Sequence, residues 1–237
     1  MNFFDLKVNI IPTIDPQCTG IVDSLSILKG FKEHNISKIC ASPFIFDIHG
    51  QNPKNILIEM QKEASKISNY DIPDIIYTTE YPINYNYSNP SALNTINKTK
   101  YLMLKFPKFD FPKNLNILLK RFNNQGFTII LNNLESNILF TKYFDMNILT
   151  ENNCLINLNI SNILLDNKSK QISFIKLLFE KKLIAVVSGF SSLISYGIIE
   201  SVNKFSYLTN IDKDKILNDY MWRNPNVISS SDKWENK

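Results

Sequence analysis

One stretch, residues 101–133, decides the fold: YLMLKFPKFDFPKNLNILLKRFNNQGFTIILNN. Its two ends, Tyr101–Phe106 and Phe127–Leu131, are apolar runs with little alternation, as expected of parallel strands buried on both faces. Between them an apolar stripe recurs at three- and four-residue steps: Leu115, Leu118, Leu119 and Phe122. Such a stripe predicts an amphipathic helix. A strand, a helix and a strand in this order indicate a parallel sheet.

The same alternation extends in both directions along the chain. Further strands are expected at Leu6–Ile11, Lys38–Ala41, Ile75–Thr79, Leu155–Ile160 and Leu183–Val187. Further helical patterns cover Ile21–Phe31, Ile56–Ile67, Phe174–Leu178, Ser191–Val202 and Lys213–Trp222. Tyr81–Thr99, which contains two prolines and many Asn and Tyr residues, predicts an extended loop. Seven strand–helix units favour the α/β class and a closed or nearly closed barrel.

Composition limits the alternatives. A chain of 237 residues, 44% of them hydrophobic, suits a single domain over residues 1–237. The net charge of +4 is spread along the chain, so no nucleic-acid role is expected. No apolar run is long enough to predict a membrane span, and the start lacks the pattern of a secretory signal. Cys18, Cys40 and Cys154 are far apart and odd in number, which indicates reduced thiols and a cytoplasmic location.

In parallel barrels, chemistry gathers where the strands end at their carboxyl side. The residues that follow the predicted strands are Asn9, Phe44, Glu80, Lys105, Asn133 and Gly189. They include one carboxylate, one lysine and no histidine. The chain has only two histidines, His34 and His49, and neither falls at such a position.

The segment Asp5–Asp15, DLKVNIIPTID, resembles the opening D-x-H-x-H-x-x-P-x-x-D of the bacterial manganese-dependent protein-tyrosine phosphatases, a branch of the PHP phosphoesterase family. Lys7 and Asn9 stand where this family has two metal-binding histidines, whereas Asp15 is kept.

Five later segments resemble the same family: ASPF at 41–44, YTTE at 77–80, NKTKYLMLKFP at 97–107, GFTIILNNLES at 126–136 and VVSGFS at 186–191. At the positions that the resemblance marks as metal ligands, Phe44 and Asn133 replace histidines and Lys105 replaces an acid. Gly189 and Ser191 replace the last Asp and His. Ser136 replaces the arginine that the family is expected to use on phosphate, while Glu80 and Glu135 are kept.

The resemblance implies a distorted (β/α)7 barrel of the PHP type, with a trinuclear metal site at one mouth. The vestigial site it marks comprises Lys7, Asn9, Asp15, Phe44, Glu80, Lys105, Asn133, Glu135, Gly189 and Ser191. Seven of these positions have lost the family's ligand. Manganese and zinc bind imidazole and carboxylate groups, and a cation placed among such ligands repels the metal. We therefore expect no catalytic residue and no cofactor, with Glu80 kept as a candidate metal ligand.

Three functional readings remain. The first is an inactive homologue kept for binding or regulation. The family then implies a link to exopolysaccharide or capsule synthesis and a protein partner, such as a tyrosine kinase or a polysaccharide-export component. The second is an active phosphatase in which Glu80, Asp15 and Glu135 still hold manganese. The third is a decaying gene product, which the intact apolar pattern disfavours. The chain lacks the H-C-x5-R loop of cysteine phosphatases and the common phosphate loops.

Without metals, a kept acid would be left buried and unpaired, which is costly. Glu80 is the acid for which this cost is expected to be greatest. Lys7 and Lys105 are new cations at neighbouring strand ends. We predict an ion pair within about 4 Å between Glu80 and one of these lysines.

Overall fold

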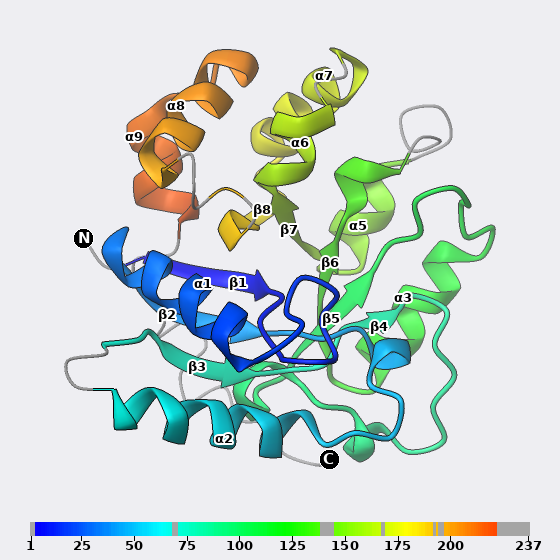
Figure 1. The fold of residues 1–237 in the computed structure, drawn as a ribbon. Coiled ribbons are helices and arrows are strands. Elements are labelled where there is room, and N and C mark those ends of the chain that lie inside the picture. Colours follow the sequence, from blue (N-terminus) through cyan, green and yellow to red (C-terminus); the bar gives the residue numbers. More distant parts are fainter. Residues whose placement is uncertain are drawn as a thin grey trace.

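The computed structural model describes residues 3–67, 71–137, 145–166, 169–191, 193 and 197–221. Its strands lie in two sheets (Figure 1). The first sheet has the order β1 (Phe3–Val8), β2 (Ile36–Ala41) and β3 (Asp74–Tyr77). The second has the order β4 (Tyr81–Pro82), β5 (Tyr101–Lys105), β6 (Thr128–Asn132), β7 (Leu155–Asn159) and β8 (Ile184–Ser188). Every strand pairing within the two sheets is parallel, as the sequence predicts.

Two connections join the edges of the sheets. An isolated parallel bridge links Phe44, after β2, to Glu80, just before β4. On the other side, β1 lies beside β8, and the carboxylate of Asp5 accepts hydrogen bonds from the backbone N–H groups of Gly189 and Phe190 at 3.1 and 2.9 Å. The strands thus follow one another around a common interior. The α/β class is confirmed, while the closed seven-unit barrel stays a prediction.

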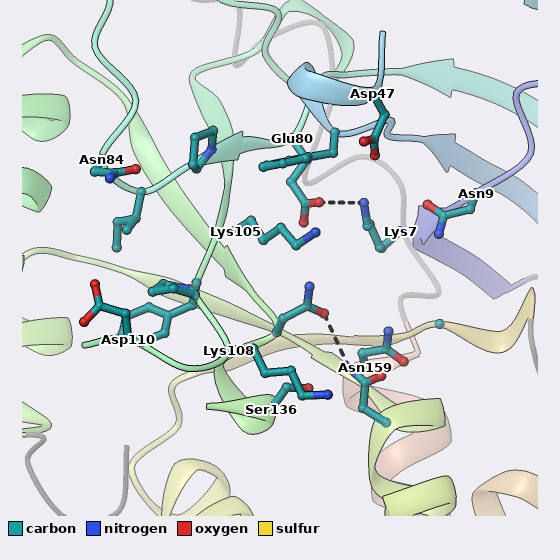
Figure 2. A pocket seen from close by; sticks show the side chains of 18 of the residues that line it. Lys7, Asn9, Asp47, Glu80, Asn84, Lys105, Lys108, Asp110, Ser136 and Asn159 are labelled. Atoms are coloured by element: carbon teal, nitrogen blue, oxygen red, sulfur yellow. Dashed lines mark hydrogen bonds and ion pairs between the residues drawn. The ribbon is translucent and has the colours of Figure 1, made fainter. Parts of the chain in front are cut away.

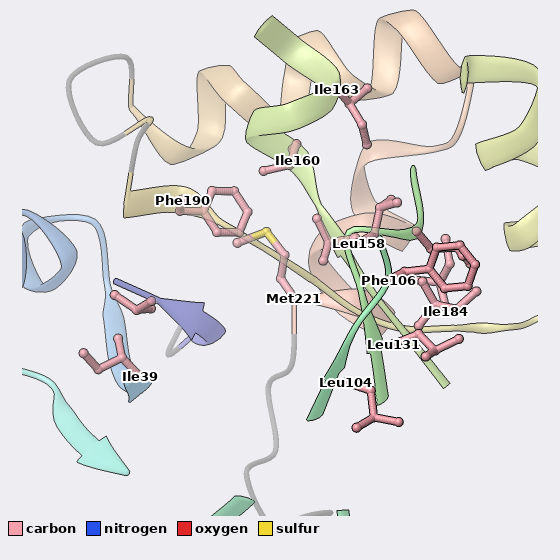
Figure 3. Close-up of a cluster of buried hydrophobic side chains, with 14 of the residues drawn as sticks. Ile39, Leu104, Phe106, Leu131, Leu158, Ile160, Ile163, Ile184, Phe190 and Met221 are labelled. Atoms are coloured by element: carbon pink, nitrogen blue, oxygen red, sulfur yellow. The ribbon is translucent and has the colours of Figure 1, made fainter. Parts of the chain in front are cut away.

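The interior holds a small apolar cluster to which strands of both sheets contribute. Its buried members are Phe4, Leu6, Cys40, Ile96, Met103, Ile130 and Val186. Their neighbours in the strands, such as Leu102 and Leu104 beside Met103, belong instead to the larger core cluster beneath the helices. Figure 3 shows part of this outer layer, including Leu104, Leu131 and Leu158. Because successive side chains of a strand point to opposite faces, both faces are buried and the strands read as continuous apolar runs.

The helices follow the strands in sequence: α1 (Ile21–Glu33), α2 (Pro53–Lys66), α3 (Leu115–Asn124), α5 (Asn147–Glu151), α6 (Ile160–Asp166), α7 (Ser169–Glu180), α8 (Ile198–Thr209) and α9 (Lys213–Lys215), which runs into a π-helical turn at Ile216–Tyr220. Short 3-10 turns occupy Ile45–Asp47 (η1), Pro90–Ala92 (η2), Ile96–Lys98 (η3) and Leu134–Ser136 (η4). No helix in these described ranges is long and apolar enough to cross a membrane.

Several predicted boundaries were wrong. The first strand ends at Val8, because Ile10 and Ile11 are buried in the following turn rather than in the sheet. Ile160 opens α6 and does not end β7. The predicted Ser191–Val202 helix begins only at Ile198. The Tyr81–Thr99 segment is mostly irregular, as predicted, but starts with β4 and contains two 3-10 turns. Trp222 lies outside the described residues.

Candidate functional site

A pocket of about 880 Å³ opens where the parallel strands end. Nine of the ten positions of the predicted site line it: Lys7, Asn9, Asp15, Phe44, Glu80, Lys105, Asn133, Gly189 and Ser191. The tenth, Glu135, is buried in η4 next to the pocket-lining residue Ser136. The structure therefore gathers side chains from both sheets at one mouth; that they are remnants of a metal site stays a prediction.

An ion pair joins the two sheets at the base of this pocket. The Lys7 ammonium lies 2.9 Å from Oε2 of Glu80 (Figure 2). It also donates to the carbonyl oxygen of Ser42 at 2.8 Å. The other oxygen of Glu80 accepts from the side-chain amide of Asn132 at 2.8 Å. Only 1% of the Glu80 side chain is exposed. The predicted pairing of Glu80 with a lysine is confirmed, and Lys7 is the partner.

Lys105, the other candidate partner, is held differently. Its ammonium lies over the ring of Phe44, 4.3 Å from the ring centre. A cation at this distance is attracted by the negative face of an aromatic ring. Within the described residues, no carboxylate lies within 4.0 Å of the Lys105 ammonium. Phe44 and Lys105, which were predicted to stand at two former ligand positions, thus contact each other.

Asp5 connects β1 to the loop after β8. Its carboxylate accepts from the backbone N–H groups of Lys7, Gly189 and Phe190. Burial raises its pKa to about 6, against the lowering effect of these three hydrogen bonds. Gly189 has a φ of +86°, and an added Cβ would stand 2.1 Å from Oδ1 of Asn159. A side chain at position 189 would therefore collide with a neighbouring strand end.

The two other acids of the predicted site, Asp15 and Glu135, each make a separate local contact. Asp15 accepts from the backbone N–H of Ile11 at 2.7 Å and so closes the turn after β1; burial raises its pKa to about 6. Glu135 accepts from the side-chain amide of Asn162 at 2.8 Å, and burial raises its pKa to about 7. Oε2 of Glu135 is buried and has no hydrogen-bond partner among the described residues.

These residues do not fit a resident metal ion. In the part of the chain that the structure describes, no three His, Cys, Asp or Glu side chains form a group that could hold one. One oxygen of Glu80 is taken by the Lys7 ammonium and the other by Asn132. Neither histidine lines the pocket: His34 ends α1, and His49 lies in an exposed turn. Lys7 and Lys105 add positive charge where an ion would need negative ligands.

Polar residues that the sequence prediction missed complete the pocket and its floor. Asn159, Asn162, Ser161, Lys108 and Lys113 line it. Asn132, Asn157 and Ser188 are buried near the strand ends. One signal was available: Asn157 and Asn159 interrupt the apolar run LINLN of β7, and an amide inside a strand buried on both faces needs a polar partner.

The fold and this mouth define an α/β protein with parallel strands whose carboxyl ends surround one pocket. The chain belongs to the CpsB/CapC family of capsular polysaccharide synthesis, which matches residues 3–192. The resemblance read from the motifs is thereby confirmed.

Two solved structures share the fold. One comes from work on YwqE from Bacillus subtilis and CpsB from Streptococcus pneumoniae, which are described as unique metal-dependent tyrosine phosphatases. It is 17% identical, with a TM-score of 0.63, over 94% of this chain and 97% of the other. The second, a lactonase from Listeria monocytogenes, is 12% identical, with a TM-score of 0.54, over 100% of this chain and 95% of the other. No curated protein sequence matches the chain.

Proposed function

We propose that this chain is a non-catalytic member of its family, kept as a binding or regulatory protein linked to capsule synthesis. The observation that carries the proposal is the ion pair between Lys7 and Glu80. A metal-dependent phosphatase uses its ions to polarise the phosphoryl group and to lower the pKa of the attacking water. Here a lysine ammonium holds the carboxylate that a metal would require.

The rest of the pocket supports the same reading. Asp15 and Glu135 are each bonded to a neighbouring amide N–H group, and neither lies in a group of possible ligands within the described residues. Gly189, at the position of a family acid, lies so close to the side chain of Asn159 that a side chain there would require Asn159 to move. Restoring a metal site would therefore require several coupled changes and not one.

The family supports a proposal for the partner. We propose that the chain acts in the cytoplasm, as one domain and without a metal cofactor, and that it binds a protein of the capsule-synthesis machinery. A tyrosine kinase or a polysaccharide-export component is the proposed class of partner, because the family belongs to capsular polysaccharide synthesis and a solved relative is described as a tyrosine phosphatase.

The decisive experiment measures hydrolysis of an aryl phosphate and of a phosphotyrosine peptide with and without added Mn²⁺. A metal-dependent phosphatase of the family is assayed in parallel as the positive control. We expect no manganese-stimulated rate from this chain, and elemental analysis of the purified protein should find no tightly bound metal. A rate that rises with Mn²⁺ and is lost in Glu80→Gln would refute the proposal and favour an active phosphatase with a reduced metal site.

A further inference from the structure

Charge is distributed unevenly around the pocket. Lys105, at the end of β5, and Lys108 and Lys113, in the loop that follows, all line it, and together they are called the lysine wall here. The first sheet and its loops contribute Asp15, Asp47 and Glu80, the last of which is paired with Lys7. One acid, Asp110, lies on the lysine side, and its Oδ1 accepts from the backbone N–H of Phe111. The lysine wall is thus the cationic side of the pocket.

Lys105 is the best-placed cation of this wall. The Phe44 ring fixes its ammonium 4.3 Å from the ring centre, and Figure 2 shows the side chain extending toward the middle of the pocket. It is partly buried, and no ion pair with a described residue neutralises it. A partly desolvated cation without a carboxylate partner gains most from an anion that enters the pocket.

A second, uncharged hydrogen-bond donor lies at the end of β7, where Asn159 has a side-chain amide. Oδ1 of Asn159 accepts from both the backbone N–H and the hydroxyl of Ser161, at 3.0 and 2.7 Å. These two bonds fix the orientation of the amide, so its Nδ2 is the side that remains for a ligand. Within the described residues no hydrogen bond from Asn159 Nδ2 is formed. Asn159 and Lys105 both line the pocket, so a charged donor and a neutral donor are available to one ligand.

The floor beneath these residues has unused hydrogen-bonding capacity. Oδ1 of Asn132, both polar atoms of the Asn157 side chain and Oγ of Ser188 are buried without a partner among the described residues. Asn132 is paired in register with Lys105 on one side and with Asn157 on the other, and Ser188 is paired with Asn159. Paired residues of parallel strands share a face, so these groups lie on the same face as Lys105. Buried polar groups are normally satisfied, so these unpartnered groups below the pocket are available to a ligand or to waters that it orders.

We propose that this pocket binds a small ligand through a carboxylate or phosphate group, without a metal, with the Lys105 ammonium as the main contact and Asn159 as a neutral donor. The volume of about 880 Å³ is within the range of small-molecule sites. The inference rests on the proposed non-catalytic function and names the class of ligand that the site receives. Lysines here supply the positive charge that ions supply in a metal-dependent relative.

The test is calorimetric titration of the full-length chain, in EDTA, with inorganic phosphate, glucuronate and uncharged glucose up to about 10 mM. We expect phosphate or glucuronate to bind and glucose not to bind; comparing the two anions identifies the preferred group. Affinity should fall as salt is added, because the contact is electrostatic. Lys105→Met should weaken anion binding by at least about tenfold, and Lys105→Arg, which keeps the charge, should retain most of it.

The matched control is Lys54→Met. Lys54 also lies over an aromatic ring, 5.4 Å from the centre of Tyr77, but it does not line the pocket. Lys54→Met removes the same charge as Lys105→Met and should leave the affinity for the anions unchanged. Equal weakening by Lys54→Met and Lys105→Met, glucose binding equal to glucuronate binding, a requirement for Mn²⁺, or no binding of either anion would each overturn the inference. Manganese-dependent hydrolysis would instead refute the proposed function, so the two failures are distinguishable.

Discussion

Lys7 and Glu80 are 73 residues apart in sequence, yet their side chains meet at 2.9 Å at the base of the pocket. The pair is largely buried, with 11% of the lysine and 1% of the glutamate side chain exposed. Two further hydrogen bonds, from Lys7 to the Ser42 carbonyl and from Asn132 to Glu80, satisfy both partners. A buried charge pair is tolerated when its remaining donors and acceptors are bonded in this way. Both oxygens of Glu80 therefore have partners, and neither is free to bind a metal.

Breaking one side of this pair should be costly. Lys7→Met leaves Glu80 buried with only the Asn132 amide, and we expect the free energy of unfolding to fall by about 3 kcal/mol. The double change Lys7→Met with Glu80→Leu removes both charges and should cost much less. Urea denaturation of the wild type, both single variants and the double variant completes the cycle.

An exposed pair provides the control for this cycle. Lys29 and Glu33 are 3.8 Å apart on α1, each 62% exposed, so Lys29→Met should change stability by less than about 0.5 kcal/mol. If the single change at Lys7 and the double change destabilise the protein equally, Lys7 and Glu80 are not coupled.

Glu135 should make stability depend on pH. Burial raises its pKa from 4.5 to about 7, so the folded state holds this proton more tightly than the unfolded state. Its contribution to stability is therefore present at low pH and lost as pH rises from 4.5 to about 7. Glu135→Gln removes this effect, and its stability relative to the wild type should increase across that interval by up to about 3 kcal/mol.

Denaturation curves at several pH values between 4 and 8 measure this effect. Asp23 serves as a control, because hydrogen bonds from Thr19 lower its pKa from 3.8 and so place its titration below this pH range. The stability difference between Asp23→Asn and the wild type should therefore stay nearly constant from pH 4 to 8. If the difference in stability between Glu135→Gln and the wild type stays constant with pH, the prediction is contradicted. Asp5 and Asp15 have pKa values raised in the same direction, so the stability of the Glu135→Gln variant keeps some pH dependence of its own.

A side chain at position 189 should destabilise the protein. Its φ of +86° is unfavourable for other residues, and a Cβ would lie 2.1 Å from Oδ1 of Asn159. Gly50 has a similar φ of +77° but has no atom within 4 Å of an added Cβ. Gly50→Ala should cost about 1 kcal/mol for the backbone alone, and Gly189→Ala at least about 1 kcal/mol more for the collision. Thermal or urea unfolding of the two variants compares them directly. Equal losses would show that Asn159 moves aside freely.

Much of the fold could be predicted from the sequence because it depends on local periodicity. Apolar runs without alternation marked strands such as β5 and β6, and the stripe in α3 marked the helix between them. Boundaries were less accurate, since Ile10 and Ile160 are buried in a turn and a helix, and burial alone does not distinguish these from a strand. The sequence also predicted that the strand ends gather on one side, because parallel strands place their carboxyl ends together.

The sequence by itself determined that strand-end residues such as Lys7, Glu80 and Lys105 gather at one pocket and that Glu80 would need a cation, but it missed other lining residues such as Asn159. It did not determine which cation. Lys7 and Lys105 are chemically equivalent, and each lies at or next to the last residue of its strand. Only three-dimensional packing places the Lys7 ammonium next to the Ser42 carbonyl and the Lys105 ammonium over the Phe44 ring. The unsatisfied amides of the floor were likewise hidden, since satisfaction depends on neighbours from other strands. Which lysine pairs with Glu80 depends on where the ends of two long side chains lie, to within a few ångströms. The tertiary structure sets those positions.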